Sequence, residues 1–120
     1  MKPIDLVLDL ISSANDHGSF QIISPYITVK PIRSIQRAIG NDTHLEVTAV
    51  FSYELFANGS SSLGAFSILS KRANTVIYAV DNLHAKVYIS GKSALIGSAN
   101  CTDRGLGLSS QSNIELLSMV

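Results

Sequence analysis

The sequence predicts an α/β fold in which a mixed β-sheet is flanked by helices. In the first half of the chain, segments with helical spacing of apolar residues alternate with segments rich in β-branched and aromatic residues. In the second half, strand-like segments follow one another directly, which predicts antiparallel neighbours in the same sheet. Hydrophobic residues make up 46% of the 120 residues and charged ones only 15%, so we expect extensive burial. This length suits one domain spanning 1–120.

The elements of the first half follow from the spacing of apolar residues. Ile4, Val7 and Ile11 recur at helical intervals behind Pro3, a residue tolerated at a first helical position. The predicted order is a helix from Pro3, a loop at 15–19, a strand at 20–27 bending near Pro25, a helix from Pro31 that stops at Gly40-Asn41, and a strand at 44–51.

The second half is predicted to contain one helix and four strands. Leu63, Phe66 and Leu69 recur at intervals of three and predict a helix after the small polar residues of 58–62. The predicted order is a loop at 58–62, a helix at 63–72, a strand at 75–80, a hairpin of two strands at 83–89 and 95–101, and a strand at 114–120. The chain stops inside or just after this strand, so we expect a longer natural protein to continue beyond it.

The hairpin carries most of the chemistry. On a strand, His84, Lys86 and Tyr88 would share one face while apolar residues occupy the other. The second strand ends in the small, polar stretch Gly97-Ser98-Ala99-Asn100. If Ser98 and Asn100 fold back beside Lys86 and His84, an imidazole, an ammonium, a hydroxyl and an amide converge. Such a group can bind an anion, and a neutral imidazole can attack it.

The geometry of this hairpin depends on its loop. Directly opposed residues of an antiparallel pair point to the same face. A three-residue loop, Gly91 to Ser93, sets His84 opposite Asn100, whereas a two-residue loop sets His84 opposite Ala99. We therefore predict an odd loop or a compensating bulge, because an unbulged two-residue turn would break the proposed site.

These residues resemble the signature of the phospholipase D superfamily, which is His-x-Lys followed about a dozen residues later by Gly-Ser-x-Asn. The matching residues are His84 and Lys86, then Gly97, Ser98 and Asn100. Leu83 and the stretch 101–106 are similar to the GSAN-x-T-x-x-G-L form of its bacterial, nuclease-like branches. Asn113-Ile114-Glu115 is similar to the Asn-x-Glu that opens the last strand of such domains. The superfamily often has Asp five positions after the Lys, where Gly91 stands here.

The resemblance implies a metal-independent phosphodiesterase without cofactors, most often a nuclease of restriction or defence systems that cleaves DNA. His84 would attack phosphorus to give a phosphohistidine, Lys86, Ser98 and Asn100 would stabilise the charge, and Glu115 would orient the imidazole. The superfamily uses two such motifs about a pseudo-two-fold axis. The sequence contains one His-x-Lys, so a homodimer would supply the second histidine.

Two other functions remain open. One is a lipid phosphodiesterase, which the lack of an amphipathic membrane helix disfavours. The other is a catalytically silent domain that binds nucleic acid or dimerises. This alternative stays open because the Asp is missing and because the net charge is zero, nine basic against nine acidic residues. Nucleic-acid-binding surfaces are normally basic, so the zero net charge weighs against a nuclease.

Several further residues have simpler interpretations. Gly91-Lys92-Ser93 is similar to the end of a P-loop but lacks its first glycine, so we interpret it as a hairpin turn. We interpret His17 and His44 as surface histidines and Cys101 as a small buried hydrophobe. Lys30, Arg33 and Arg37 form a basic stripe that is either a solvated helix face or a weak nucleic-acid contact. Ser24, Pro25 and Tyr26 either line the pocket or pack in the core.

Composition bounds the location. No stretch of about 18 apolar residues is present, so we expect no membrane-spanning helix. The acidic residues Asp5 and Asp9 argue against a signal peptide. A single cysteine excludes an internal disulfide and fits a reducing cytoplasm, and without a Cys/His cluster we expect no zinc site.

Overall fold

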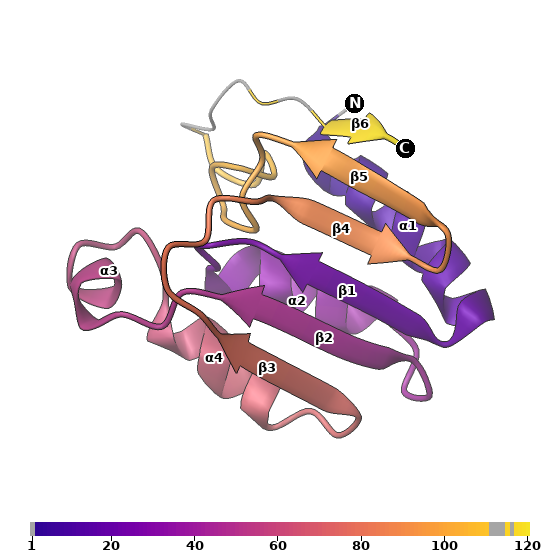
Figure 1. Ribbon diagram of the computed structural model, residues 1–120, viewed down its shortest axis with the longest axis horizontal. Coiled ribbons are helices and arrows are strands. Elements are labelled where there is room, and N and C mark those ends of the chain that lie inside the picture. The colour runs from indigo at the N-terminus through magenta and orange to yellow at the C-terminus, as the bar shows by residue number, and fades with distance from the viewer. Residues whose placement is uncertain (1, 111–114, 116) are drawn as a thin grey trace.

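The computed structural model describes residues 2–110, 115 and 117–120, and its sheet and helices confirm the mixed α/β fold. The sheet has six strands in the order β3-β2-β1-β4-β5-β6 (Figure 1). Its elements, in chain order, are α1 (Pro3–His17), β1 (Ser19–Ile23), α2 (Val29–Ala38), β2 (His44–Ala49), α3 (Tyr53–Ala57), α4 (Leu63–Ser70), β3 (Thr75–Ala79), β4 (Val87–Ser90), β5 (Ser93–Gly97) and β6 (Leu117–Met119).

The sheet combines a parallel half with an antiparallel half. β2 lies between β1 and β3 and is parallel to both. β4 pairs antiparallel with β1 and with β5, and β5 pairs antiparallel with β6. The carboxyl ends of β1, β2 and β3 and the amino end of β4 therefore lie at one edge of the sheet, which we call the carboxyl edge (Figure 1).

The hydrophobic core lies between the sheet and three helices. Figure 1 shows α1, α2 and α4 together behind one face of the sheet. Alternate strand residues such as Phe20, Ile22, Leu45 and Val47 point to this face and are fully buried. Burying apolar side chains is favourable by about 25 cal/mol per Å² of apolar surface, so this face holds the fold together.

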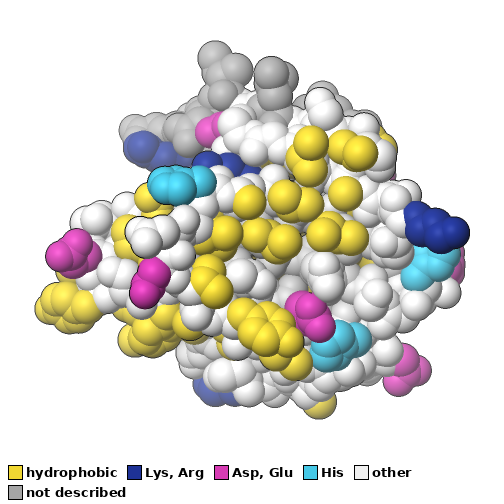
Figure 2. Space-filling view, in the orientation of Figure 1, with side chains coloured by type: hydrophobic (Ala, Val, Ile, Leu, Met, Phe, Trp, Pro, Cys, Tyr) yellow, Lys and Arg dark blue, Asp and Glu magenta, His cyan; other side chains and the backbone are white. Residues whose placement is uncertain are grey.

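The opposite face of the sheet carries no helix among the described residues. Ladder register places Tyr78, Thr48, Ile23, Val87 and Ile96 in one row across this face. Tyr78 and Ile96 are 48% and 44% exposed. Figure 2 views this face and shows hydrophobic side chains over the middle of the sheet.

Several elements differ from the sequence prediction; for example, α2 begins at Val29 rather than at Pro31, and β5 spans Ser93–Gly97 rather than 95–101. α1 continues through the expected loop to His17, because Gly18 at φ +85 ends the helix and its N–H bonds to Ala14 O. β1 stops at Ile23, where Ser24 and Pro25 turn the chain. The short helix α3 was not predicted from the sequence, because five residues are too few to show a helical period.

Candidate active site

His84 and Lys86 lie on the connection between β3 and β4, not on a strand. The expectation that the strand would begin near His84 is therefore wrong, since β4 begins at Val87. This connection runs along the carboxyl edge (Figure 1). The His84 side chain is exposed and that of Lys86 is half-buried. Lys86 Nζ donates a hydrogen bond to the carbonyl oxygen of His84 at 3.1 Å, which holds the ammonium close to the histidine backbone.

Tyr88 does not share a surface with His84, and that part of the prediction is also wrong. Tyr88 is fully buried on the helix-covered face, while Val87 and Ile89 point to the open face. Its hydroxyl donates to the carbonyl oxygen of Ala99 at 2.9 Å. Burial, and then the negative charges of Cys101 and Glu115, raise the pKa of Tyr88 well above its ordinary value. The buried phenol therefore stays a hydrogen-bond donor and ties β4 to the Gly-Ser-Ala-Asn segment.

The hairpin has a two-residue loop and no bulge in its ladder, so the prediction of an odd loop or a compensating bulge is wrong. Ser90 pairs with Ser93, and Gly91 takes φ +55 in the loop between them. The register runs without a bulge to the pair Val87 and Ile96. His84 and Asn100 lie beyond this last pair, so the alternation of side chains along the ladder does not decide where they point.

The second motif segment follows β5 to the same edge. The N–H of Gly97 donates to Lys86 O at 3.3 Å, which joins the two motif segments at their first point of contact. Ser98 is exposed, and Asn100 is half-buried. This backbone hydrogen bond sets the start of the second motif segment beside Lys86.

The hydroxyl group of Ser24 supports the Asn100 segment through hydrogen bonds. The buried Ser24 hydroxyl donates to Tyr26 O at 2.7 Å and accepts a bond from the Cys101 N–H at 2.9 Å. It also lies 3.4 Å from Asn100 Oδ1. The sequence does not show this role of Ser24, because Asn100 and Cys101 lie more than 70 residues away along the chain.

A tight turn after Asn100 fixes the end of the motif. Thr102 N–H donates to Asn100 O at 2.8 Å, and Gly105 N–H donates to Thr102 Oγ1 at 3.0 Å. A Cβ atom on Gly105 would lie 2.2 Å from Asn100 O. The turn therefore requires glycine at this position, which explains the glycine in the resemblance noted for 101–106.

A polar cavity of about 650 Å³ opens beside Asn100. It lies at the carboxyl edge, where the segments after β1, α3 and β5 meet. Residues from these three segments form its wall, among them Tyr26, Thr28, Asn58, Asn100, Asp103 and Arg104. Tyr26 is thus placed at the pocket, whereas Pro25 is buried.

Two further residues were predicted for the site, Glu115 and Asn113. Glu115 is half-buried, and its charge acts on Tyr88, on the opposite side of β4 from the open face. Asn113 lies outside the described residues.

The remaining candidates do not line this cavity. Lys30, Arg33 and Arg37 are exposed on α2, and none of them is among the described residues that line the cavity. His17 is exposed at the end of α1. Cys101 is fully buried, and burial raises the pKa of its thiol, as expected of a small core residue rather than a nucleophile.

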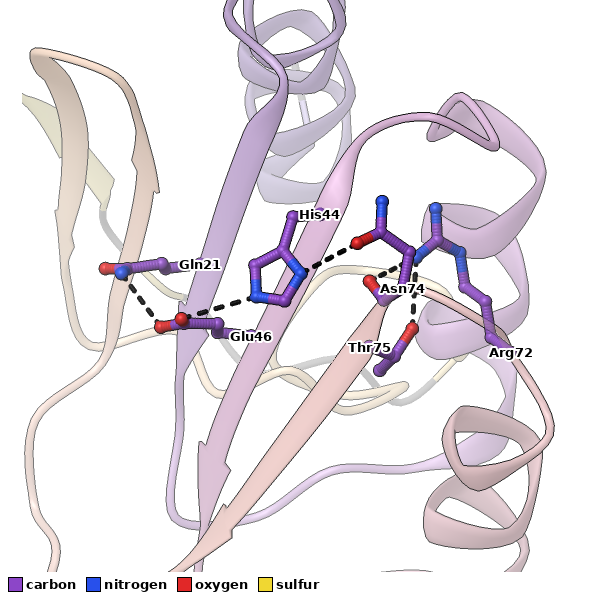
Figure 3. Close-up of polar contacts among 6 residues, drawn as sticks. All are labelled: Gln21, His44, Glu46, Arg72, Asn74 and Thr75. Atoms are coloured by element: carbon purple, nitrogen blue, oxygen red, sulfur yellow. Dashed lines mark hydrogen bonds and ion pairs between the residues drawn. The ribbon is translucent and has the colours of Figure 1, made fainter.

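His44 has more partners than the sequence indicated. Its Nδ1 lies 3.0 Å from Asn74 Oδ1 and its Nε2 lies 3.4 Å from Glu46 Oε1, which in turn belongs to a carboxylate bonded by Gln21 (Figure 3). The neighbouring Arg72 donates to the carbonyl oxygens of Gly40, Thr43, Ala73 and Asn74 and to Thr75 Oγ1. His44 and Asn74 stand at the amino ends of β2 and β3, so this cluster holds the edge opposite the motif.

The described residues include neither a metal-binding cluster nor a membrane-spanning helix. They contain no group of three or more His, Cys, Asp or Glu side chains able to hold a metal ion. Among these same residues, no helix is both long and apolar enough to cross a bilayer.

Comparison with known proteins places these features in context. A family model described as "Cardiolipin synthase, PLD-like domain" matches residues 7–120. No curated protein matches the sequence. Among solved structures, the archaeal chromatin protein TrmBL2, described as showing a novel mode of DNA binding, is similar with a TM-score of 0.50 and 14% identity. The match covers 81% of this chain and 37% of TrmBL2, and at this identity it shows the fold alone.

Proposed function

This chain belongs to the family of phospholipase D-like domains, and on that premise we propose that it is a metal-independent phosphodiesterase that cleaves DNA. The observation that carries the proposal is the backbone contact between Lys86 and Gly97 at the carboxyl edge. It supports the convergence of an exposed imidazole with the hydroxyl and amide donors of the second motif segment.

His84 is the nucleophile in this proposal. A neutral imidazole is not repelled by the anionic phosphodiester, so its unprotonated nitrogen attacks phosphorus and forms an N–P bond. The P–O bond to the leaving nucleoside breaks, and the leaving oxygen takes a proton from a general acid. Water then attacks the phosphohistidine, which releases the phosphate monoester and regenerates the imidazole.

Lys86, Ser98 and Asn100 stabilise the charge that develops on the phosphoryl oxygens. An ammonium, a hydroxyl and an amide NH₂ are all donors that suit an oxyanion. Ser24 and the turn at Gly105 support Asn100, which limits the reorganisation needed when the substrate binds. In this proposal Glu115 accepts a hydrogen bond from the second ring nitrogen of His84 and sets its tautomer.

The general acid is His84 of a second copy of the chain. The sequence holds only one His-x-Lys, while the step above needs a nucleophile and an acid on opposite sides of phosphorus. A two-fold axis through the phosphate would supply both from one kind of residue. The two imidazoles would then titrate as a coupled pair, one neutral and one protonated.

DNA is the substrate that suits the pocket. The family model is described by cardiolipin synthase, an enzyme of lipid chemistry, and TrmBL2 is described as binding DNA. The cavity beside Asn100 is lined mainly by amides, hydroxyls and charged groups. Acyl chains need apolar walls, whereas a nucleotide offers donors and acceptors to such a surface.

Replacement of the nucleophile tests the activity. His84→Ala should reduce cleavage of DNA and of bis(p-nitrophenyl) phosphate by at least about a thousandfold, because no other group supplies the N–P bond. His17→Ala, at an exposed position on α1, is the matched control and should cleave both substrates like the wild type. Circular dichroism checks that each variant is folded. A His84→Ala protein with wild-type activity would exclude the mechanism.

A catalytically silent DNA-binding domain is the second candidate. Gly91 replaces the Asp common in the family, and the short hairpin loop with its φ of +55 suits glycine there. Such a domain would bind DNA with an affinity that falls steeply as salt rises, and it would leave the DNA intact. Turnover of bis(p-nitrophenyl) phosphate by the wild type excludes this alternative.

A further inference from the structure

We propose that the cavity beside Asn100 binds the deoxynucleoside next to the scissile phosphate. This inference rests on the function proposed above, because Asn100 links the cavity to the phosphate site. The cavity volume of about 650 Å³ lies within the range of roughly 300–1,000 Å³ that is usual for small-ligand sites. Three features of its wall select a nucleoside.

The first feature is a fixed carboxylate. The Thr28 hydroxyl donates to Asp103 Oδ1 at 2.8 Å, and the Asp103 N–H donates back to Thr28 Oγ1 at 2.9 Å. This reciprocal pair holds the half-buried Asp103 side chain against the start of α2. An ionised carboxylate only accepts hydrogen bonds, so the ligand must present a donor here. A sugar hydroxyl or a base N–H does so, while a phosphate would be repelled.

The second feature is an aromatic ring and an amide in the same wall. Tyr26 is 36% exposed, and nucleobases stack on exposed aromatic rings in many nucleic-acid sites. Asn58 Oδ1 accepts the N–H of Ser60 at 2.8 Å, which orients the amide and leaves its NH₂ group for other acceptors. Base edges carry both donors and acceptors, so an amide and a carboxylate together suit them.

The third feature is the position of positive charge. Arg104 lies on the same wall as Asp103 and is exposed. Its guanidinium offsets the carboxylate and attracts the negative backbone of DNA. The wall therefore offers the ligand an acceptor at Asp103 and a positive charge at Arg104, which together suit a nucleotide.

Binding of 2′-deoxyadenosine 5′-monophosphate to the full chain tests this inference without any turnover. We expect the nucleotide to perturb the NMR signals of Tyr26, Asn58 and Asp103, and inorganic phosphate to leave them unchanged. Tyr26→Leu should weaken nucleotide binding about tenfold or more, and Tyr26→Phe, which keeps the ring, should restore most of it. Tyr53→Leu, at a tyrosine that is 84% exposed elsewhere, is the matched control.

Either of two results would overturn the inference. One is a Tyr26→Leu protein that binds the nucleotide as tightly as the wild type. The other is a nucleotide that perturbs the same signals as inorganic phosphate and no others. Because nothing is cleaved in this experiment, its outcome is separate from that of His84→Ala, and a failure of catalysis would not be mistaken for a failure of the nucleoside site.

Discussion

Tyr88 joins the two motif segments from the buried side of the sheet. Its hydroxyl reaches Ala99 O, two residues from the exposed Gly97 and directly before Asn100. A buried carbonyl without a donor costs about 1–3 kcal/mol, so this one bond is a large part of what keeps the second segment in place. Tyr88, a fully buried side chain, thus helps to position the motif residues that face solvent.

Burial of Tyr88 and Cys101 makes the folded state sensitive to alkaline pH. The pKa of each group is raised in the folded protein, so the fold holds the neutral form. The ordinary pKa is 9.0 for Cys101 and 10.0 for Tyr88. The stabilisation from each group is complete below its ordinary pKa and is lost as pH rises from there toward its folded pKa. We expect the free energy of unfolding in urea to begin to fall near about pH 9 and to keep falling as pH rises further.

Two variants separate the contributions to this pH dependence. Cys101→Ala should remove the part of the decline that begins near pH 9.0, and Tyr88→Phe the part that begins near pH 10.0. Each variant is less stable than the wild type at neutral pH, by about 1–3 kcal/mol for the lost hydrogen bond of Tyr88→Phe. A Tyr88→Phe protein whose stability declines above pH 10.0 as steeply as that of the wild type would contradict the assignment.

Metal removal tests the chemistry at the same scale. In the proposed mechanism the nucleophile and the charge stabilisation come from His84, Lys86 and their neighbours. Cleavage of DNA should therefore continue at the same rate after dialysis against a chelator, measured with a fluorescent oligonucleotide. If the chelator abolishes cleavage and added Mg²⁺ or Zn²⁺ restores it, the imidazole mechanism does not hold.

The turn at 100–106 is the element on which the second motif segment depends. Gly105→Ala would place a Cβ 2.2 Å from Asn100 O and 2.9 Å from Asn100 N, and backbone atoms cannot give way cheaply. We expect a loss of about 1–3 kcal/mol or more in urea unfolding, together with a strong loss of DNA cleavage. Gly40→Ala, whose Cβ would meet side-chain atoms at an ordinary 3.4 Å, is the control. Equal stability of the two variants would argue against this role of the turn.

Most elements could be predicted from the sequence because their apolar spacing is determined locally. The helix behind Pro3 and the strand β2 are examples, and both elements formed where the pattern indicated them. The hairpin shows the limit of this reasoning. The alternating pattern extends from Tyr88 back to His84, but β4 begins at Val87, and only the pairing with β1 and β5 sets that boundary.

The site was predictable in its segments but not in its support. The motif spacing identifies His84, Lys86 and Asn100, since these residues lie close together in sequence. Ser24 and Thr28 contact the second segment across more than 70 residues, and no local pattern carries such a contact. The cavity likewise exists only because three loops meet at one edge of the sheet.

At the scale of the whole molecule, the chain places its three long helices on one face and its motif at the carboxyl edge (Figure 1). The edge is left accessible, with His84 and Ser98 exposed. A single copy of the motif offers one imidazole to this edge. We therefore propose that a complete site needs two chains, each of which contributes its own His84.

Mixing of wild-type and His84→Ala chains tests this claim most directly. The two proteins are unfolded together, refolded at equal amounts so that subunits pair at random, and assayed for DNA cleavage per total protein. A site shared between two chains predicts about one quarter of the wild-type activity, because only wild-type pairs have both histidines, whereas independent sites predict about one half. A value near one quarter is the result we expect, and a value near one half would contradict the shared site.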